Sequence, residues 1–299
     1  MRVLVTGASG FIGGFVCAEL LRHEHQVVAL VRRPGSQPAG TTAVLGDLST
    51  ADGLNGVFDS TSVDCVIHLA AEIATQRSAA KINATNINGM RRLIDACEKH
   101  LVERFVFTST VVTGEANGAV LTEDSPLPIH TEYGRSKQAG ETMLRESKLA
   151  SLIIRPGHVY GPGGWYENEI VKRLKQPGRF VVIGSGRNWR DMVHVDDVAS
   201  ALVAAAERGQ ANEIYHCADD QPITQDDFVA LTARALGVGA PRHVPLWLAR
   251  LAVGRDTTLS IARSAKTSNK KLKRELGWSP KFAAVEFGVP AALATLSDR

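Results

Sequence analysis

The sequence has few cysteines, and no spacing pattern joins them. Cys17, Cys65, Cys97 and Cys217 are widely separated among 299 residues, without the close pairs that zinc sites use. Three of them lie in apolar helical or strand contexts, where free thiols behave as small hydrophobic residues. We therefore expect buried, reduced cysteines, no metal site and a cytoplasmic protein.

Long hydrophobic runs are also lacking. No stretch approaches the roughly 20 apolar residues that a membrane-spanning helix needs, and the first residues do not follow the pattern of a secretion signal. The excess of charge is small: 34 basic against 31 acidic side chains give a net charge of +3. Because these charges are also dispersed, we expect neither a nucleic-acid nor a membrane partner.

Short apolar runs alternate with helix-length segments over the first half of the chain. Near-continuous runs are typical of strands that are buried on both faces of a parallel sheet. We expect strands at 3–5, 27–31, 43–45, 65–67, 105–107 and 152–154, separated by helices that include 11–23, 82–99 and 132–147. This alternation predicts an α/β fold, a Rossmann-type doubly wound parallel sheet.

The alternation loosens after Pro156. A Gly- and Pro-rich loop follows at 161–164, and we then expect an alanine-rich helix at 195–207, a strand at 214–217 and helices at 224–236 and 269–276. The pattern predicts a large sheet domain, residues 1–156, to which residues 193–218 return. Residues 157–192 and 219–299 are predicted to form a small, mostly helical domain.

A glycine-rich turn, residues 6–13 (TGASGFIG), lies between the first predicted strand and helix. Gly7 permits the tight turn, Gly10 lets the backbone approach a pyrophosphate, and Gly13 lets the helix pack against the strand. Backbone N–H groups at the helix start, which includes Phe11 and Ile12, then bind the phosphates. The turn predicts that residues 1–156 bind a dinucleotide; a glycine-rich connection without a ligand is the alternative.

Two arginines, Arg32 and Arg33, follow the second predicted strand. A site selective for NAD would place an acidic side chain here to bind the ribose 2′-hydroxyl. An arginine fork instead suits a 2′-phosphate. We therefore favour NADP(H) over NAD(H) as the cofactor, with arginines that merely solvate a strand end as the alternative.

Tyr133 and Lys137 are spaced i, i+4 in a predicted helix, so they share one of its faces. A free tyrosine has a pKa of about 10 and needs nearby positive charge to act as a base near neutral pH. Lys137 supplies that charge, and in the reducing direction Tyr133 gives its proton to the developing alkoxide. An ordinary exposed pair on a helix is the alternative.

These motifs, in this order, resemble those of the extended short-chain dehydrogenases/reductases, the NAD-dependent epimerase/dehydratase group, over nearly the whole chain. The resemblance implies that Ser109 hydrogen-bonds and orients the substrate oxygen, and that Lys137 also binds the nicotinamide ribose. The further cofactor-binding residues that it implies are Asp47, Leu48, Leu69, Ala70, Ala71, Asn86, Tyr133, Pro156 and Val159. One departure is Thr113, where many sugar-modifying relatives have tyrosine. We also expect a homodimer.

Other polar residues have two interpretations. Asp47 either contacts adenine or is a helix N-cap or turn residue, and His68 fits a hydrogen-bonded core histidine better than a catalytic one. The stretch from His194 to Asp197 predicts a helix start, since carboxylates suit that end of the helix dipole, and it does not predict a metal site.

Four residues are predicted to face the substrate: Thr110, His158, Trp165 and Arg190. His158 and Trp165 flank the flexible loop 161–164, although Trp165 could equally anchor its segment in the core. Arg190 resembles an arginine with which sugar-nucleotide enzymes hold a diphosphate, and its fork suits phosphate.

Three functions for a small-molecule substrate follow. The first, which Arg32 and Arg33 favour, is net NADP-dependent reduction or oxidation of a carbonyl/alcohol pair. The second, which Arg190 favours, is epimerisation or dehydration of a nucleotide sugar with internal recycling of the cofactor. The third is a non-catalytic cofactor sensor, which would not need Ser109, Tyr133 and Lys137.

Overall fold

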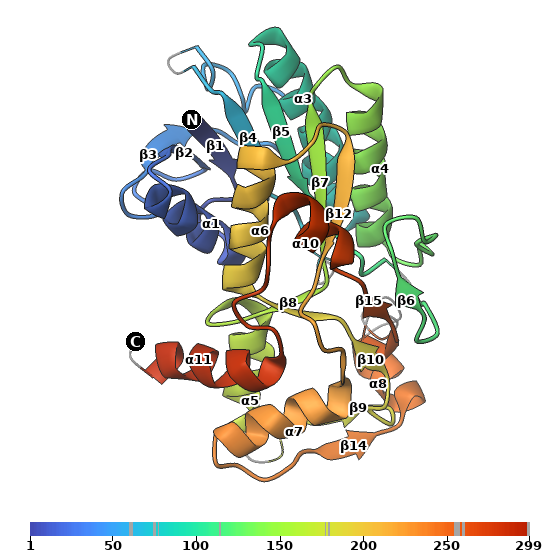
Figure 1. Cartoon of the computed structure of the whole chain (residues 1–299). Coiled ribbons are helices and arrows are strands. Elements are labelled where there is room, and N and C mark those ends of the chain that lie inside the picture. Colours follow the sequence, from blue (N-terminus) through green and yellow to red (C-terminus); the bar gives the residue numbers. More distant parts are fainter. Residues whose placement is uncertain are drawn as a thin grey trace.

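A computed structural model describes residues 1–59, 62–73, 76, 78–113, 115–176, 178, 180–253, 258 and 261–297. Its centre is a seven-stranded parallel sheet in the order β12-β7-β5-β4-β1-β2-β3 (Figure 1). Its strands are β1 (Arg2–Thr6), β2 (Gln26–Val31), β3 (Thr42–Leu45), β4 (Cys65–His68), β5 (Arg104–Thr108), β7 (Ser151–Pro156) and β12 (Glu213–Cys217). The predicted Rossmann-type fold is confirmed.

Helices cover both faces of this sheet (Figure 1). On one face α1 (Phe11–Arg22) packs against α6 (Val195–Arg208), and on the other α3 (Met90–Lys99) packs against α4 (Glu132–Glu146). The predicted helix 82–99 differs from expectation, because it begins with α2 (Ala79–Ile82) and widens into a π-helical segment, η1 (Asn83–Gly89). Gly89 lies so close to Leu48 that a Cβ there would be 2.7 Å from its carbonyl oxygen.

Side-chain caps fix the helix starts that matter for the site. Thr131 Oγ1 accepts a hydrogen bond from Gly134 N at 3.0 Å and begins α4. The ring of His194 accepts from Asp196 N at 3.2 Å and begins α6, whose first turn also holds Asp197. The first backbone N–H groups of a helix have no partner within the helix, and capping side chains accept hydrogen bonds from them. The structure thus contains the predicted helix start at 194–197.

The remaining elements mix helices with short strands, and most of them gather below the sheet in Figure 1, whereas α10 (Lys270–Leu276) lies beside α6 and β12. The helices are η2 (Tyr166–Val171), α5 (Lys172–Leu174), α7 (Gln225–Ala235), α8 (Leu246–Val253), α10 (Lys270–Leu276) and α11 (Val285–Ser297). The strand pairs are β10 (Trp189–Arg190) with β13 (Ile223–Thr224), β11 (Met192–His194) with β8 (His158–Tyr160), β14 (Arg242–Val244) with β9 (Val181–Ile183), and β15 (Lys266–Thr267) with β6 (Val120–Leu121). The division into domains at 156, 192 and 218 stays a prediction.

All four cysteines are free and buried. No helix within the described residues is long and apolar enough to cross a membrane. The same part of the chain contains no group of three His, Cys, Asp or Glu side chains arranged to hold a metal ion.

Parallel pairing brings the predicted site residues to one edge of the sheet. The glycine turn follows β1, Ser109 and Thr110 follow β5, and Pro156 ends β7. Ligands of open α/β sheets bind outside the carboxyl ends of the strands, so this edge is where the site is to be sought.

Candidate active site

The glycine turn forms a cradle of backbone atoms. Gly7 has a φ of +71°, and a Cβ on it would lie 2.8 Å from Ala70 N; a Cβ on Gly13 would lie 2.1 Å from Gly7 O. Gly10, which precedes α1, caps the helix with no side chain. The N–H groups at the start of α1 are thus left to an external acceptor, so the turn fits the phosphates of a dinucleotide.

Leu69 and Ala70, two of the predicted cofactor-binding residues, lie against this turn. The backbone of Leu69 and Ala70 limits the space beside Gly7, and the Phe11 ring packs against the predicted loop, 2.6 Å from where a Cβ on Gly164 would be. Asn86 joins the end of β4 to α4, because its Nδ2 donates to Glu72 O and to Ser136 Oγ, each at 2.9 Å. The cofactor contacts of these residues stay a prediction.

At the end of β2, Arg32 and Arg33 are exposed. Asp47 lies in a turn in which its Oδ1 accepts from Ser49 N at 2.8 Å and from Ser49 Oγ at 2.7 Å. These bonds, and then the positive charge of Arg32, hold the pKa of Asp47 below its usual value. The contacts with Ser49 therefore support the interpretation of Asp47 as a turn residue, and its contact with adenine stays a prediction.

His68 is a core histidine in the structure. It is 1% exposed, its Nδ1 lies 2.6 Å from Thr6 Oγ1, and its ring stacks on Phe107. Burial lowers its pKa to about 3, so the ring is neutral near pH 7. This environment matches the structural interpretation rather than a catalytic one.

Tyr133 and Lys137 share the face of α4 that meets the end of β5. Lys137 Nζ donates to Thr108 O at 2.7 Å and lies 5.9 Å from the centroid of the Tyr133 ring. Burial raises the pKa of Tyr133 to about 12 and lowers that of Lys137 to about 7. Tyr133 is therefore a proton donor at neutral pH, and it acts as a base only beside a charged lysine.

The two hydroxyls after β5 have different partners. Ser109 Oγ donates to Glu141 Oε1 at 2.6 Å, so its proton is directed to a buried carboxylate and not to the substrate oxygen expected from the sequence. Thr110 Oγ1 accepts from Val112 N at 2.9 Å, and its own proton has Pro156 O only at 3.5 Å. That distance is at the limit for a hydrogen bond. The hydroxyl proton of Thr110 is therefore bound more weakly than that of Ser109 and is the better placed of the two to bind a substrate.

Sequence reasoning missed Glu141 and its partner Arg155. Glu141 follows Lys137 by one helical turn, and this i, i+4 spacing was the available signal. Both side chains are buried, and Arg155 donates from Nε and Nη2 to the two carboxylate oxygens at 2.8 and 2.6 Å.

His158 and Arg190, two of the predicted substrate residues, contact each other. Arg190 Nη1 lies 2.7 Å from His158 Nε2, and His158 Nδ1 lies 2.8 Å from Asp191 Oδ1. Burial, followed by the charge of Arg190, lowers the pKa of His158 to about 4. The neutral ring thus accepts at Nε2 from arginine and donates at Nδ1 to aspartate.

Arg263 completes this cluster and was also missed. It is 1% exposed, its Nη1 lies 3.1 Å from both oxygens of Asp191, and its Nη2 donates to Val111 O at 3.0 Å. Thr267 Oγ1 donates to Asp191 Oδ2 at 2.6 Å. The cluster therefore ties the C-terminal part of the chain to the segment after Thr110, and no sequence motif marks Arg263.

Trp165 is held by a backbone bond. Its Nε1 donates to Val159 O at 2.5 Å, and its partly buried ring packs edge-on to Tyr166. These contacts support the anchoring role, while a role in the substrate pocket stays a prediction.

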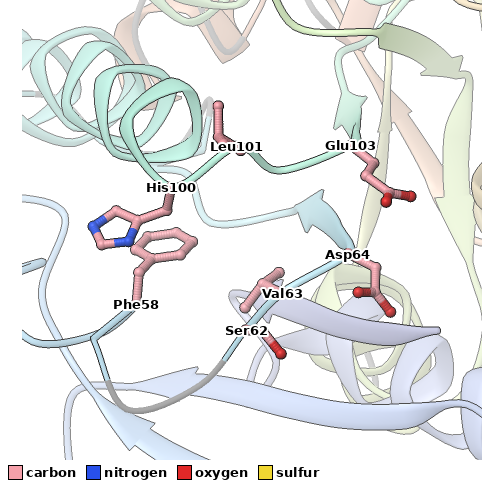
Figure 2. Close-up of a pocket in the computed structure, with 7 residues that line it drawn as sticks. All are labelled: Phe58, Ser62, Val63, Asp64, His100, Leu101 and Glu103. Atoms are coloured by element: carbon pink, nitrogen blue, oxygen red, sulfur yellow. The ribbon is translucent and has the colours of Figure 1, made fainter.

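The depression in Figure 2 lies at the amino ends of the parallel strands, opposite their carboxyl ends, where the Tyr133 site lies. It is lined by Phe58, Ser62, Val63, Asp64, His100, Leu101 and Glu103. Asp64 and Glu103 immediately precede β4 and β5, at their amino ends. Because the strands are parallel, this depression is separate from the Tyr133 site.

The buried histidines make the fold sensitive to acid. Burial lowers the pKa values from 6.5 to about 3 or 4 at His68, His158, His194 and His216. Between pH 6.5 and 4 the unfolded chain thus binds protons on these rings that the folded chain does not bind. The free energy of unfolding therefore falls as the pH falls through this window.

Two aspartates oppose this effect, because burial raises the pKa of Asp197 to about 6 and that of Asp219 to about 9. With these aspartates included, the unfolded chain binds roughly two protons more than the folded chain near pH 5.5. The free energy of unfolding then changes by roughly 2 to 3 kcal/mol per pH unit. We expect urea titrations to give a steep loss of stability from pH 6.5 to 5. A free energy of unfolding that stays constant over this range would contradict the account.

The sequence and the fold are similar to those of known proteins. Residues 3–218 match the model of the NAD dependent epimerase/dehydratase family. The chain is 31% identical to the 2-alkyl-3-oxoalkanoate reductase of Stenotrophomonas maltophilia over 81% of this chain and 77% of that protein. It is 29% identical to a 3-diazoavenalumate denitrifying reductase of a Streptomyces species, over 94% and 96%. The Thermus thermophilus UDP-glucose 4-epimerase, solved with NAD, has 27% identity and a TM-score of 0.85 over 99% of each chain.

Proposed function

The chain belongs to the NAD-dependent epimerase/dehydratase family of oxidoreductases, and we propose that it uses NADPH to reduce a ketone of a small molecule to a secondary alcohol. The observation that carries the proposal is the Tyr133–Lys137 pair at the carboxyl edge of the sheet, with Tyr133 protonated at neutral pH. The two curated relatives named as reductases support the direction of the reaction.

In the proposed mechanism Tyr133 gives its phenolic proton to the carbonyl oxygen as that oxygen gains charge. The Thr110 hydroxyl donates to the same oxygen and orients it, a role that we assign to Thr110 because Ser109 is bound to Glu141. Lys137 stabilises the phenolate that remains on Tyr133. The nicotinamide, when bound, supplies the hydride.

The choice of NADPH rests on Arg32 and Arg33, which are exposed beyond β2 without an acidic residue in their place. We expect Arg32→Ala to weaken NADPH binding by about tenfold or more, because hydrogen bonds to charged groups contribute about 1.5–3 kcal/mol. NADH, which has no 2′-phosphate, should lose little. Fluorescence titration with both cofactors measures the difference.

Arg91→Ala is the matched control, since Arg91 is an exposed arginine on α3. It should leave both affinities unchanged. Equal losses of NADPH and NADH affinity in Arg32→Ala would rule out recognition of the 2′-phosphate.

Turnover assays test the function itself. We expect a panel of 3-oxo acids and other small ketones to include one that is reduced with one NADPH consumed per alcohol formed. Conversion of UDP-glucose or dTDP-glucose without net consumption of NADPH would contradict the proposal.

Those nucleotide sugars represent the second candidate function, epimerisation or dehydration with internal recycling of NAD. The Arg190 cluster beside the site favours it, since arginine suits a diphosphate, as does the likeness to the UDP-glucose 4-epimerase solved with NAD. The guanidinium of Arg190 is already bound to His158, Gln225 and Ile261 O, and this engagement makes us place the function second.

A cytoplasmic location and a homodimer also belong to the proposal. The four free, buried thiols support a reducing compartment. Light scattering coupled to size exclusion would measure the oligomeric state directly.

A further inference from the structure

A buried carboxylate that the proposed mechanism does not use lies on the face of α4 that carries the Tyr133–Lys137 pair. Glu141 follows Lys137 by one turn and is 1% exposed. Strands β5 and β7 both hold it, because Ser109 Oγ donates to Oε1 at 2.6 Å and Arg155 binds both oxygens. A buried carboxylate that is bonded in this way at both oxygens is fixed in place.

The Lys137 ammonium is buried and requires a compensating charge. The titratable groups that face it are Tyr133 and Glu141 on its own helix and His68 on β4. His68 is neutral and Tyr133 is protonated near pH 7, so within the described residues Glu141 is the anion of this set. Burial lowers the pKa of Lys137 to about 7, and the charge of Glu141 acts against that shift.

We propose that Glu141 is a positioning residue that keeps Lys137 charged near neutral pH. The inference rests on the proposed function, in which Lys137 stabilises the phenolate that Tyr133 becomes after it has given up its proton. Glu141 thus acts on the reaction through Lys137 and touches neither substrate nor cofactor. Its ion pair with Arg155 fixes it in place, and Arg145, at 3.1 Å on the exposed side, is its other cationic partner.

Arg155 allows the charge effect to be separated from a structural one. Glu141→Gln removes the anion and should lower the titration midpoint of Lys137 by about one pH unit, the effect typical of a nearby opposite charge. Arg155→Met removes a cation and frees the charge of Glu141, so it should raise the midpoint. A purely structural role would shift both variants in the same direction or leave both unchanged.

The ionisation of Lys137 can be followed without substrate or cofactor. We would record carbon-13 NMR of lysine Cε in the full chain against pH, and assign the signal by its loss in Lys137→Arg. Glu146→Gln, which removes an exposed carboxylate from the end of α4, is the matched control and should leave the midpoint unchanged.

The double variant Glu141→Gln/Arg155→Met allows the test to be made even if a single variant fails to fold. Losing one partner of a buried pair is costly, whereas replacing both by uncharged groups is often tolerated. Its Lys137 midpoint should also lie below that of the wild-type chain. A midpoint equal to the wild-type value in the double variant would overturn the inference, whether or not the single variants fold.

This titration needs no turnover, so it is independent of the proposed function. If the midpoint shifts as expected but no ketone of the panel is reduced, the proposed function fails and with it the catalytic meaning of the shift. If Tyr133→Phe abolishes reduction but the midpoint does not move, only the role of Glu141 fails.

Discussion

Tyr133→Phe should reduce the rate of NADPH-dependent reduction by about 10²–10⁴-fold, the usual contribution of a general acid. The substitution removes the phenolic proton and keeps the ring that lies 5.9 Å from Lys137 Nζ. NADPH affinity should therefore change little. Steady-state turnover with the best ketone of the panel, together with a fluorescence titration of NADPH, measures both quantities.

Tyr166→Phe provides the control for this substitution. Tyr166 is a fully buried tyrosine whose hydroxyl lies 3.4 Å from Thr232 Oγ1, and Tyr166→Phe keeps the ring that packs edge-on to Trp165. Its loss should leave turnover nearly unchanged. A general acid contributes about 10²–10⁴-fold. If Tyr133→Phe kept more than about a tenth of the wild-type rate, the loss would be smaller than this range, and Tyr133 would not be the acid.

Arg263→Met should lower the free energy of unfolding by about 3–5 kcal/mol, because removal of one partner from a buried ion pair leaves the other charge uncompensated. Arg263 is 1% exposed, and it binds both oxygens of Asp191 as well as Val111 O. Its charge also holds the pKa of the Asp191 carboxyl below the usual range. Urea denaturation of the two proteins measures the loss.

Arg274→Met is the matched substitution, since the Arg274 side chain is 68% exposed and that of its partner Glu275 is 23% exposed. Exposed ion pairs contribute about 0–1 kcal/mol, so this variant should remain close to the wild-type stability. A similar loss in the two variants would show that Arg263 acts through something other than its buried pairing.

The sheet was predictable from the sequence because a parallel strand buried on both faces must be apolar throughout. The run at 65–67 illustrates this, since Cys65, Val66 and Ile67 are all fully buried between the two helical layers. The glycine turn was predictable for a different reason: Gly7 and Gly13 stand where any Cβ would meet backbone atoms.

The helix of Tyr133 and Lys137 was likewise predictable, because both residues lie close together in the sequence and their spacing sets their common face. The direction of the neighbouring hydroxyls was not. Ser109 and Thr110 are adjacent, and only the position of Glu141 across the interface decides which proton is committed. Sequence periodicity carries no information on such a contact between a strand end and a helix.

The cluster around Asp191 could not be predicted for the same physical reason. Arg263 reaches Asp191 across a separation of 72 residues, which includes α6, β12, α7 and α8. The π-helical segment at 83–89 was also missed. It ends at Gly89, against the backbone of Leu48, and helical periodicity does not encode a tertiary contact of this kind.

The nucleotide carried by the freshly purified protein tests the central claim, net reduction by NADPH, most directly. The protein is denatured, the released nucleotide is identified by mass spectrometry, and the intact protein is titrated with NADPH and NADH. The account predicts little retained nucleotide and tighter binding of NADPH than of NADH, because a reductase must exchange its cofactor at each turnover. Stoichiometric NAD that remains bound and does not exchange with NADPH would contradict it.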